Sequence, residues 1–188
     1  LNLFFSQQIN ENTKTLPQDD DKLQHQCLML MDEFTSIGAV EIIAHAVSYM
    51  AGYNMRLLPI IQSMSQLDAT YGREKARTLM TNHATQIIYT PREQNDANEY
   101  SEMLGYTTVK KRNMTRGRDV SYSESEERRA LMLPQELKAM SPEKEILLIE
   151  GMNNPAQVDK IRYYQEKMFK ERLMKPVIIP TLQIANAK

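Results

Sequence analysis

Short, mainly apolar runs recur along the chain and predict β-strands. They occupy residues 27–31 (CLMLM), 55–61 (MRLLPII) and 87–90 (IIYT). The run at 27–31 is continuous and does not alternate, which is typical of a strand buried on both faces of a parallel sheet. Pro59 is unusual inside a central strand, because proline cannot donate a hydrogen bond to a neighbouring strand.

Segments with apolar residues at every third or fourth position lie beside these runs and predict α-helices. They are residues 1–9, 40–50, 65–71, 73–82 and 93–104. Gly52 and Gly105 are placed where glycine commonly ends a helix. Strands that alternate with helices indicate βαβ units. The pattern therefore predicts an α/β fold with a mainly parallel sheet flanked by helices.

The residue pattern changes at residues 110–129, which have no apolar periodicity. Basic residues come first in this segment and acidic residues follow. The segment begins with a basic cluster and continues with three acids: Lys110, Lys111, Arg112, Arg116 and Arg118, then Glu124, Glu126 and Glu127. We expect a flexible surface loop here. Residues 145–150 and 158–164 regain strand character, and the chain from residue 175 is expected to be an extended tail.

Composition narrows the class of protein. A length of 188 residues allows one ordinary domain or part of a larger one. With 23 Lys+Arg against 24 Asp+Glu, the net charge of −1 excludes a highly basic nucleic-acid sleeve. The single cysteine, Cys27, excludes an internal disulfide framework, and we expect it to be a small core residue. No apolar run approaches the ~20 residues that cross a bilayer. Because the first residue is Leu1 rather than Met, we expect a piece of a longer protein.

Two acids directly follow the first predicted strand, in the stretch LMLMDE. Asp32 and Glu33 would lie at the carboxyl end of that strand, where open α/β sheets bind ligands. In P-loop nucleotide hydrolases, the first such acid helps to hold Mg²⁺, usually through water, and the second polarises the attacking water. The alternative is structural, since an acid here could favour the positive end of a following helix. The local pattern alone favours this alternative.

Gln62 and Ser63 follow the second predicted strand in the same way. A polar side chain at this position could sense the γ-phosphate of a nucleotide. It could equally be a turn residue that bonds to nearby backbone. His25, His45 and His83 are scattered without metal-ligand spacing, so we assign none of them to a metal. The glycine-rich phosphate loop G-x-x-x-x-G-K-[ST] does not occur in the sequence.

Several stretches together resemble the carboxyl-terminal half of the motor domain of type IV secretion and conjugation coupling proteins, the TraG/VirD-type family. They follow the family's order over most of the chain: LNLFF (1–5), LMLMDEFTSIG (28–38), SYMAGYNMRLLPIIQSMSQLDATYG (48–72), LMTNHATQIIYTPRE (79–93), YSEMLGYTTV (100–109), RALMLPQEL (129–137) and KIRYY (160–164). The resemblance implies a partial RecA-like P-loop NTPase fold, related to FtsK-type DNA translocases. Residues 1–188 would be its part from the Walker B acids onward.

The resemblance implies that Asp32 organises Mg²⁺, Glu33 activates water and Gln62 senses the γ-phosphate of ATP. The phosphate loop, an inner-membrane anchor and an all-helical insertion would lie outside this chain, so we expect the chain alone to be inactive. An arginine that reaches the neighbouring subunit's nucleotide in some relatives has no clear counterpart; Arg56, Arg73 and Arg77 are alternatives.

The family also implies a function for the whole protein. Homo-hexameric rings in the bacterial inner membrane would use ATP hydrolysis in a cytoplasmic domain. They would pass relaxase–DNA complexes or effector proteins to other components of the secretion system. Two alternatives remain open: a recruitment platform with secondary ATPase activity, and another FtsK-like ring ATPase. For the basic cluster at 110–118, a solvated connector is the simpler interpretation, and contact with DNA phosphates is the sharper one.

Overall fold

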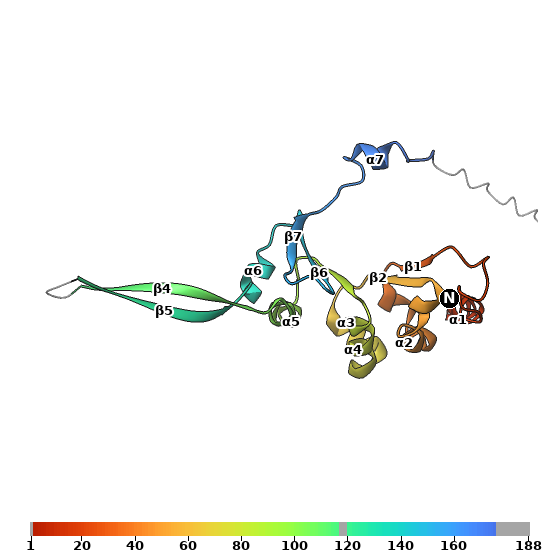
Figure 1. Ribbon diagram of the computed structural model, residues 1–188, viewed down its shortest axis with the longest axis horizontal. Helices are drawn as coiled ribbons and strands as arrows, with labels where there is room; N and C mark the ends of the chain where they lie inside the picture. The colour runs from red at the N-terminus through yellow and green to blue at the C-terminus, as the bar shows by residue number, and fades with distance from the viewer. Residues whose placement is uncertain (1, 117–119, 176–188) are drawn as a thin grey trace, which may run out of the picture. The chain divides into compact units, whose positions relative to one another are not determined.

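The computed structural model describes residues 2–116 and 120–175, with the backbone alone at 112–116 and 120–123. The chain divides into two compact units, Leu1–Val158 and Asp159–Lys188. Figure 1 shows the order of the helices and strands along the chain.

The two strands that precede the candidate acids and Gln62 pair in parallel. Strand β1 (Cys27–Met31) lies beside β2 (Met55–Pro59), with Cys27 opposite Met55 and Met31 opposite Pro59. Pro59 is thus the last residue of its strand, where its missing N–H interrupts little.

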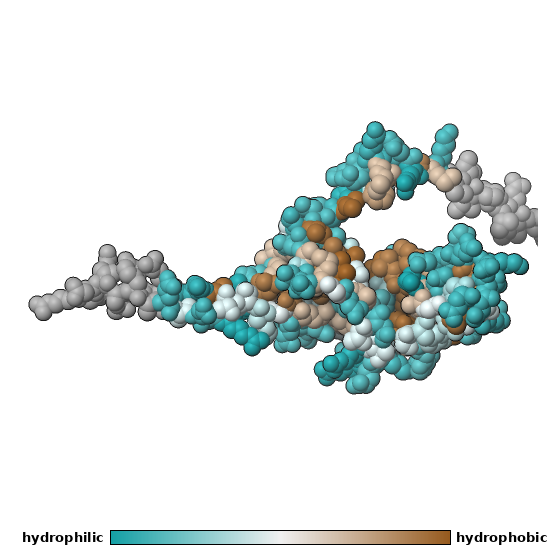
Figure 2. All heavy atoms as spheres, in the orientation of Figure 1, coloured by the Kyte–Doolittle hydropathy of each residue, from teal (hydrophilic) through white to brown (hydrophobic). Residues whose placement is uncertain are grey.

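One face of this pair is covered and the other is open. Met29 and Met31 are buried, whereas Leu28 and Leu30 on the opposite face are each 59% exposed. The expectation that the first strand is buried on both faces is therefore wrong for this chain, and Cys27 is exposed rather than a core residue. Figure 2 shows hydrophobic residues gathered over β1 and β2.

Four helices contribute to the core on the covered face. They are α1 (Asn2–Asn12), α2 (Glu41–Ala46), α3 (Met64–Tyr71) and α4 (Arg73–Thr81). Their buried residues form one cluster with the methionines of β1 and β2. Within it, the rings of Phe34 and Tyr71 stack at 5.2 Å between centroids, and the Val40 N–H donates to the Tyr71 hydroxyl at 3.1 Å. The predicted helices at 65–71 and 73–82 are confirmed.

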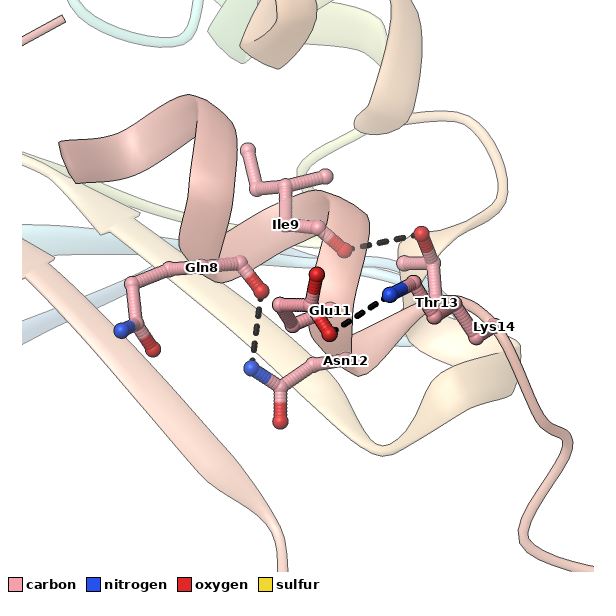
Figure 3. Close-up of polar contacts among 6 residues, drawn as sticks. All are labelled: Gln8, Ile9, Glu11, Asn12, Thr13 and Lys14. Carbon is pink, nitrogen blue, oxygen red and sulfur yellow. Dashed lines mark hydrogen bonds and ion pairs between the residues drawn. The ribbon is translucent and has the colours of Figure 1, made fainter. Parts of the chain in front are cut away.

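The first helix continues beyond its predicted end at residue 9. At its carboxyl end, two side chains donate to backbone carbonyl groups one turn earlier (Figure 3). Asn12 Nδ2 donates to the Gln8 carbonyl at 2.7 Å, and Thr13 Oγ1 donates to the Ile9 carbonyl at 2.8 Å. These bonds add local contacts at the polar end of the helix, which extends three residues beyond the predicted end.

The second helix is shorter than its apolar spacing predicted. It ends at Ala46, and after a turn the 3₁₀ helix η2 (Met50–Tyr53) follows. The Ser48 hydroxyl donates to the His45 carbonyl at 3.0 Å, a local bond that competes with helix continuation. Gly52 lies inside η2 and does not end the helix. Asn54 ends η2 instead, in the left-handed region at φ 58°.

A second sheet has the order β3–β6–β7, formed by β3 (Thr85–Ile88), β6 (Lys144–Ile149) and β7 (Ala156–Asp159). Strands β3 and β6 are antiparallel, so the parallel sheet of the described residues is small. Helices α5 (Gln94–Leu104) and α6 (Pro134–Lys138) share a second core with this sheet. That core contains Ile88, Leu104, Leu137, Met140 and Ile146. The predicted strand at 158–164 is wrong beyond Asp159.

The predicted loop at 110–129 is wrong, because most of it belongs to an antiparallel β-hairpin. Strands β4 (Tyr106–Arg116) and β5 (Val120–Ala130) pair from Tyr106–Ala130 to Arg116–Val120. The register sets Lys110 opposite Glu126 and Arg112 opposite Glu124. Opposite charges on facing positions stabilise a strand pair without any apolar periodicity.

In its described residues, 159–175, the second unit contains one short helix, α7 (Lys167–Lys170). Most of the large apolar side chains described in this unit are solvent-exposed: Ile161, Tyr163, Tyr164, Met168, Leu173 and Met174. The tail predicted from residue 175 lies, apart from Lys175, outside the described residues. No helix in the described part of the chain has the length and apolarity needed to cross a bilayer.

Candidate functional site

The two segments that leave β1 and β2 stay together beyond the strand ends. The Ile60 N–H donates to the Met31 carbonyl, and the Phe34 N–H donates to the Ile60 carbonyl, both at 2.9 Å. These bonds hold Asp32 and Glu33 beside the residues that lead to Gln62. The structure therefore brings the predicted acids and the predicted glutamine to one edge, the carboxyl edge of the parallel pair.

Glu33 has an unusual backbone conformation at this edge. Its φ of 50° and ψ of 50° lie in the left-handed region, which non-glycine residues adopt at a cost of roughly 1–3 kcal/mol. This turn leads directly into the 3₁₀ helix η1 (Phe34–Ile37), and the Glu33 side chain makes no capping hydrogen bond to it. The helix-cap interpretation therefore lacks its expected contact at Glu33. The exposed carboxylate remains available to solvent and ligands.

Glu33 and Gln62 line the same surface hollow, which has a volume of about 340 Å³. The remaining lining residues come from η1 and α3: Thr35, Ser36, Gln66, Ala69 and Thr70. Asp32 is exposed but is not among the lining residues. The hollow offers one carboxylate, two amides and three hydroxyls, a set suited to polar oxygens and water.

The residues at this edge could form only part of a site for Mg²⁺ and a nucleotide. Carboxylate oxygens such as those of Asp32 suit Mg²⁺, which keeps several of its own waters. Among the described residues, no group of three or more His, Cys, Asp or Glu side chains could hold a metal ion directly. Groups from elsewhere would have to bind the phosphates.

The segment directly after Gln62 is held by hydrogen bonds. Ser63 is buried and caps α3, accepting from the Gln66 N–H at 3.3 Å. Ser63 is thus a turn residue that bonds to nearby backbone, as the simpler interpretation of this pair expected. Gln62 is exposed at the hollow. A contact of 3.4 Å from the Thr35 hydroxyl to Gln66 Oε1 connects η1 with α3.

Two acids at the start of helix α5, its N-cap residue Glu93 and Asp96 in its first turn, contact the same segment. The Ser65 hydroxyl donates to Glu93 Oε2 at 2.8 Å. The Asp96 side chain is only 3% exposed, and its carboxylate accepts a hydrogen bond from the Met64 N–H. Neither acid was predicted from the sequence. A signal was present, however: Asp96, Tyr100 and Leu104 recur every four residues, which places an acid on the buried side of the helix.

Burial changes the acidity of this cluster. Desolvation raises the pKa of the Asp96 carboxyl, and the nearby Glu93 carboxylate raises it further, while the hydrogen bond from Met64 opposes both effects. Burial also raises the pKa of Tyr100 to about 12, with Asp96 and Glu99 adding to the shift. A buried carboxylate with these neighbours carries a cost that its hydrogen bond partly offsets.

The basic cluster is partly neutralised within the hairpin. Lys111 Nζ lies 2.9 Å from Glu127 Oε2, and this ion pair raises the pKa of Lys111. The register also sets acids opposite Lys110 and Arg112, whereas Arg116 pairs with Val120. Arg118 lies outside the described residues.

The three candidate arginines differ in their surroundings. The Arg56 guanidinium donates to the backbone carbonyls of Ala51 at 2.7 Å and Met55 at 3.1 Å. These nearby residues therefore already bind the Arg56 side chain. Arg73 and Arg77 are exposed on α4.

The fold resembles solved structures of the plasmid coupling protein TrwB. The form in complex with ADP and Mg²⁺ superposes with a TM-score of 0.63 at 19% sequence identity, covering 80% of this chain and 33% of that chain. The form in complex with an ATP analogue gives 0.58 at 21% identity. The chain therefore has part of a RecA-like P-loop NTPase fold.

The sequence identifies the family. The family model described as type IV secretory system conjugative DNA transfer matches residues 1–186. The chain belongs to this family of type IV coupling proteins. Protein VirD4 of Rhizobium radiobacter is 29% identical over 174 residues, which cover 90% of this chain and 25% of that protein. The conjugal transfer protein TraG of Escherichia coli is 32% identical over 133 residues, covering 64% of this chain and 21% of that protein. The chain thus spans about a quarter of the length of these relatives.

Proposed function

We propose that the carboxyl edge of the parallel strand pair supplies residues for ATP hydrolysis in the motor of a type IV coupling protein. The observation that carries the proposal is that Glu33 and Gln62, which follow two neighbouring parallel strands, line one hollow. In open α/β sheets, ligands bind at the carboxyl ends of the strands, which is where this hollow lies. The fold and family of the chain support this assignment.

Each polar residue at the edge has a distinct role in this proposal. Glu33 orients and polarises the water that attacks the γ-phosphate of ATP. Gln62 donates its amide to that phosphate and thereby responds to its release. Asp32 binds the water shell of Mg²⁺, which neutralises phosphate charge when it is present. Holding water in line for attack requires a rigid edge, and the hydrogen bonds that join the two strand ends supply it.

The phosphate loop of the motor would come from a part of the protein outside this chain. The inner-membrane anchor and the all-helical insertion would also lie there. Without backbone amides and a lysine to cradle the β- and γ-phosphates, this chain alone is expected not to hydrolyse ATP. Turnover by the purified chain that Glu33→Gln abolishes would contradict this expectation.

The whole protein would form a homo-hexameric ring whose cytoplasmic domain moves relaxase–DNA complexes or effector proteins to other secretion components. The experiment compares full-length protein with its Glu33→Gln variant in ATP binding and in conjugative transfer. We expect nearly unchanged ATP binding and lost transfer, because the carboxylate acts on water rather than on bound nucleotide. Glu74→Gln, at an exposed acid in the first turn of α4, is the matched control and should transfer normally. Wild-type transfer by Glu33→Gln would restore the structural interpretation of this acid.

A second candidate function is recruitment of substrate with hydrolysis in a secondary role. The hairpin supports it, because two 11-residue strands form an exposed arm whose described side chains contribute nothing to either core. Movement of DNA by the full-length protein that depends on ATP would favour the motor. Substrate binding that persists without any such movement would favour the platform.

A further inference from the structure

The chain between Gln62 and the first turn of α3 is held from outside its own helix. Ser63 caps α3 from within, but the next two residues bond to α5: the Met64 N–H to Asp96 and the Ser65 hydroxyl to Glu93. Helix α5 begins 32 residues after Gln62, since it starts at Gln94. The position of Gln62 therefore depends on a distant helix as well as on strand β2.

The contact between Met64 and Asp96 is the stronger of these two. The Asp96 side chain is 3% exposed, whereas the contact between Ser65 and Glu93 is solvent-exposed. A hydrogen bond to a buried ionised group stabilises more than one in water. Leaving either of its two groups without a hydrogen-bond partner is costly. The first N–H groups of a helix have no partner within the helix, so an external acceptor fixes where α3 begins.

If position 96 served packing alone, we would expect an apolar residue there rather than an acid. An aliphatic side chain there would avoid the cost of burying a carboxyl group. The acid instead accepts from Met64, two residues beyond the residue that faces the hollow. The contact thus fixes backbone position at the edge of the site.

We propose that Asp96 is a positioning residue that holds the Gln62 amide in place for the reaction. This inference rests on the proposed function of the Glu33–Gln62 hollow. Asp96 touches no substrate and acts only through the segment at residues 62–64. Losing its hydrogen bond lets the start of α3 shift, and displacements of about 1 Å can cost as much as 100-fold in rate.

The test measures steady-state ATP hydrolysis by the full-length protein, read as inorganic phosphate release, for Gln62→Ala, Asp96→Ala and the double variant. We expect Asp96→Ala to lower kcat roughly tenfold with KM for ATP unchanged, because only the alignment of the attack is lost. The double variant should be no slower than Gln62→Ala alone, since both changes act through one group. Asp96→Asn should restore most activity, because its side-chain oxygen still accepts from the Met64 N–H. Glu102→Ala, at an exposed acid on the same helix, should change nothing.

One further variant keeps the test decisive. If Asp96→Ala does not fold, Asp96→Leu fills the same space without an acceptor and should show the same loss of kcat. Normal kcat in the Asp96 variants beside a slow Gln62→Ala would overturn the positioning role and leave the proposed function intact. Additive losses in the double variant would do the same. A full-length protein that hydrolyses no ATP, or in which Gln62→Ala has no effect, would overturn the proposed function itself.

Discussion

The strand ends at Glu33 and Gln62 and the β4–β5 hairpin are stabilised in opposite ways. Behind the strand ends lies a continuous apolar core in which Phe34 is 1% exposed and Ile43 fully buried. In the hairpin, none of the described side chains is buried. Figure 2 shows mainly hydrophilic and neutral residues along its visible side. Cross-strand contacts, such as Lys111 with Glu127 and the Arg128 guanidinium 3.9 Å from the centre of the Tyr106 ring, take the place of a core.

This difference matches what each region is proposed to do. A site that aligns water for attack needs neighbours that hold their positions to a fraction of an ångström, which close packing provides. An arm that meets a partner gains from solvated charges and from strands that can open locally. Helix α5 connects the two regions: Asp96 contacts the start of α3, and the buried Ser101 hydroxyl donates to the Met132 carbonyl at 2.6 Å, just beyond β5.

The largest expected effect is on stability. Phe34→Ala should lower the free energy of unfolding by about 3–5 kcal/mol, because it removes a fully buried ring and leaves a cavity beside Tyr71. Val109→Ala in the hairpin should cost less than about 1 kcal/mol, since that side chain is 36% exposed. Urea denaturation of this chain measures both. Equal losses would mean that the hairpin has a core of its own.

The next effect concerns DNA binding by the hairpin in the full cytoplasmic domain. Replacing Lys110, Lys111, Arg112, Arg116 and Arg118 with Ser should weaken DNA binding and make its salt dependence shallower, by ~0.9 in log–log slope per lost phosphate contact. Lys111→Ser alone should change the slope little, because Glu127 already pairs with that lysine. An unchanged affinity and slope in the fivefold variant would show that the cluster does not bind DNA.

The pH dependence of stability separates the two regions more finely. The pKa of Asp96 is raised in the folded state, so its ionised form opposes folding above the unfolded pKa, and protonation on lowering the pH removes this cost. Asp96→Asn should therefore raise the melting temperature of this chain at pH 7, and the difference should shrink as the pH falls toward 4. The neighbours Glu93, Glu99 and Tyr100 are unchanged in this comparison. A difference that grows on acidification would contradict the raised pKa.

The smallest effect concerns the hairpin's exposed ion pair. The Lys111–Glu127 contact lowers the pKa of Glu127, so the pair favours folding above the usual carboxyl range and is lost as the pH falls through that lowered pKa. Glu127→Gln should change the melting temperature only slightly at low salt and not at all at 1 M salt. The exchange Lys111→Glu with Glu127→Lys should restore the wild-type value. A large effect at high salt would mean that Glu127 does more than pair with this lysine.

Much of the region around the strand ends was predictable because apolar spacing directs it. The predicted strand at 27–31 is confirmed, and the one predicted at 55–61 is a strand over Met55–Pro59. Helices α3, α4 and α5 lie where helical spacing placed them. The open face at Leu28 and Leu30 was not predictable. An apolar run indicates that a face can be buried, but not whether the residues that bury it belong to the same chain.

The hairpin and Asp96 escaped prediction for a shared physical reason. Lys110 and Glu126 lie 16 residues apart and meet only through the strand register. Asp96 likewise meets Met64 across 32 residues. Interactions between polar groups distant in sequence leave no local periodicity, so apolar patterns do not report them. The roles of Asp32, Glu33 and Gln62 remain predictions that the geometry supports.

The central claim is that the hollow between Glu33 and Gln62 receives the γ-phosphate. A structure of the full-length protein with a non-hydrolysable ATP analogue and Mg²⁺ tests it most directly. We predict the γ-phosphate within ~3 Å of the Gln62 amide, with the Glu33 carboxylate facing a water in line with the phosphorus. A γ-phosphate bound away from this hollow, with Glu33 and Gln62 both pointing to solvent, would contradict the account.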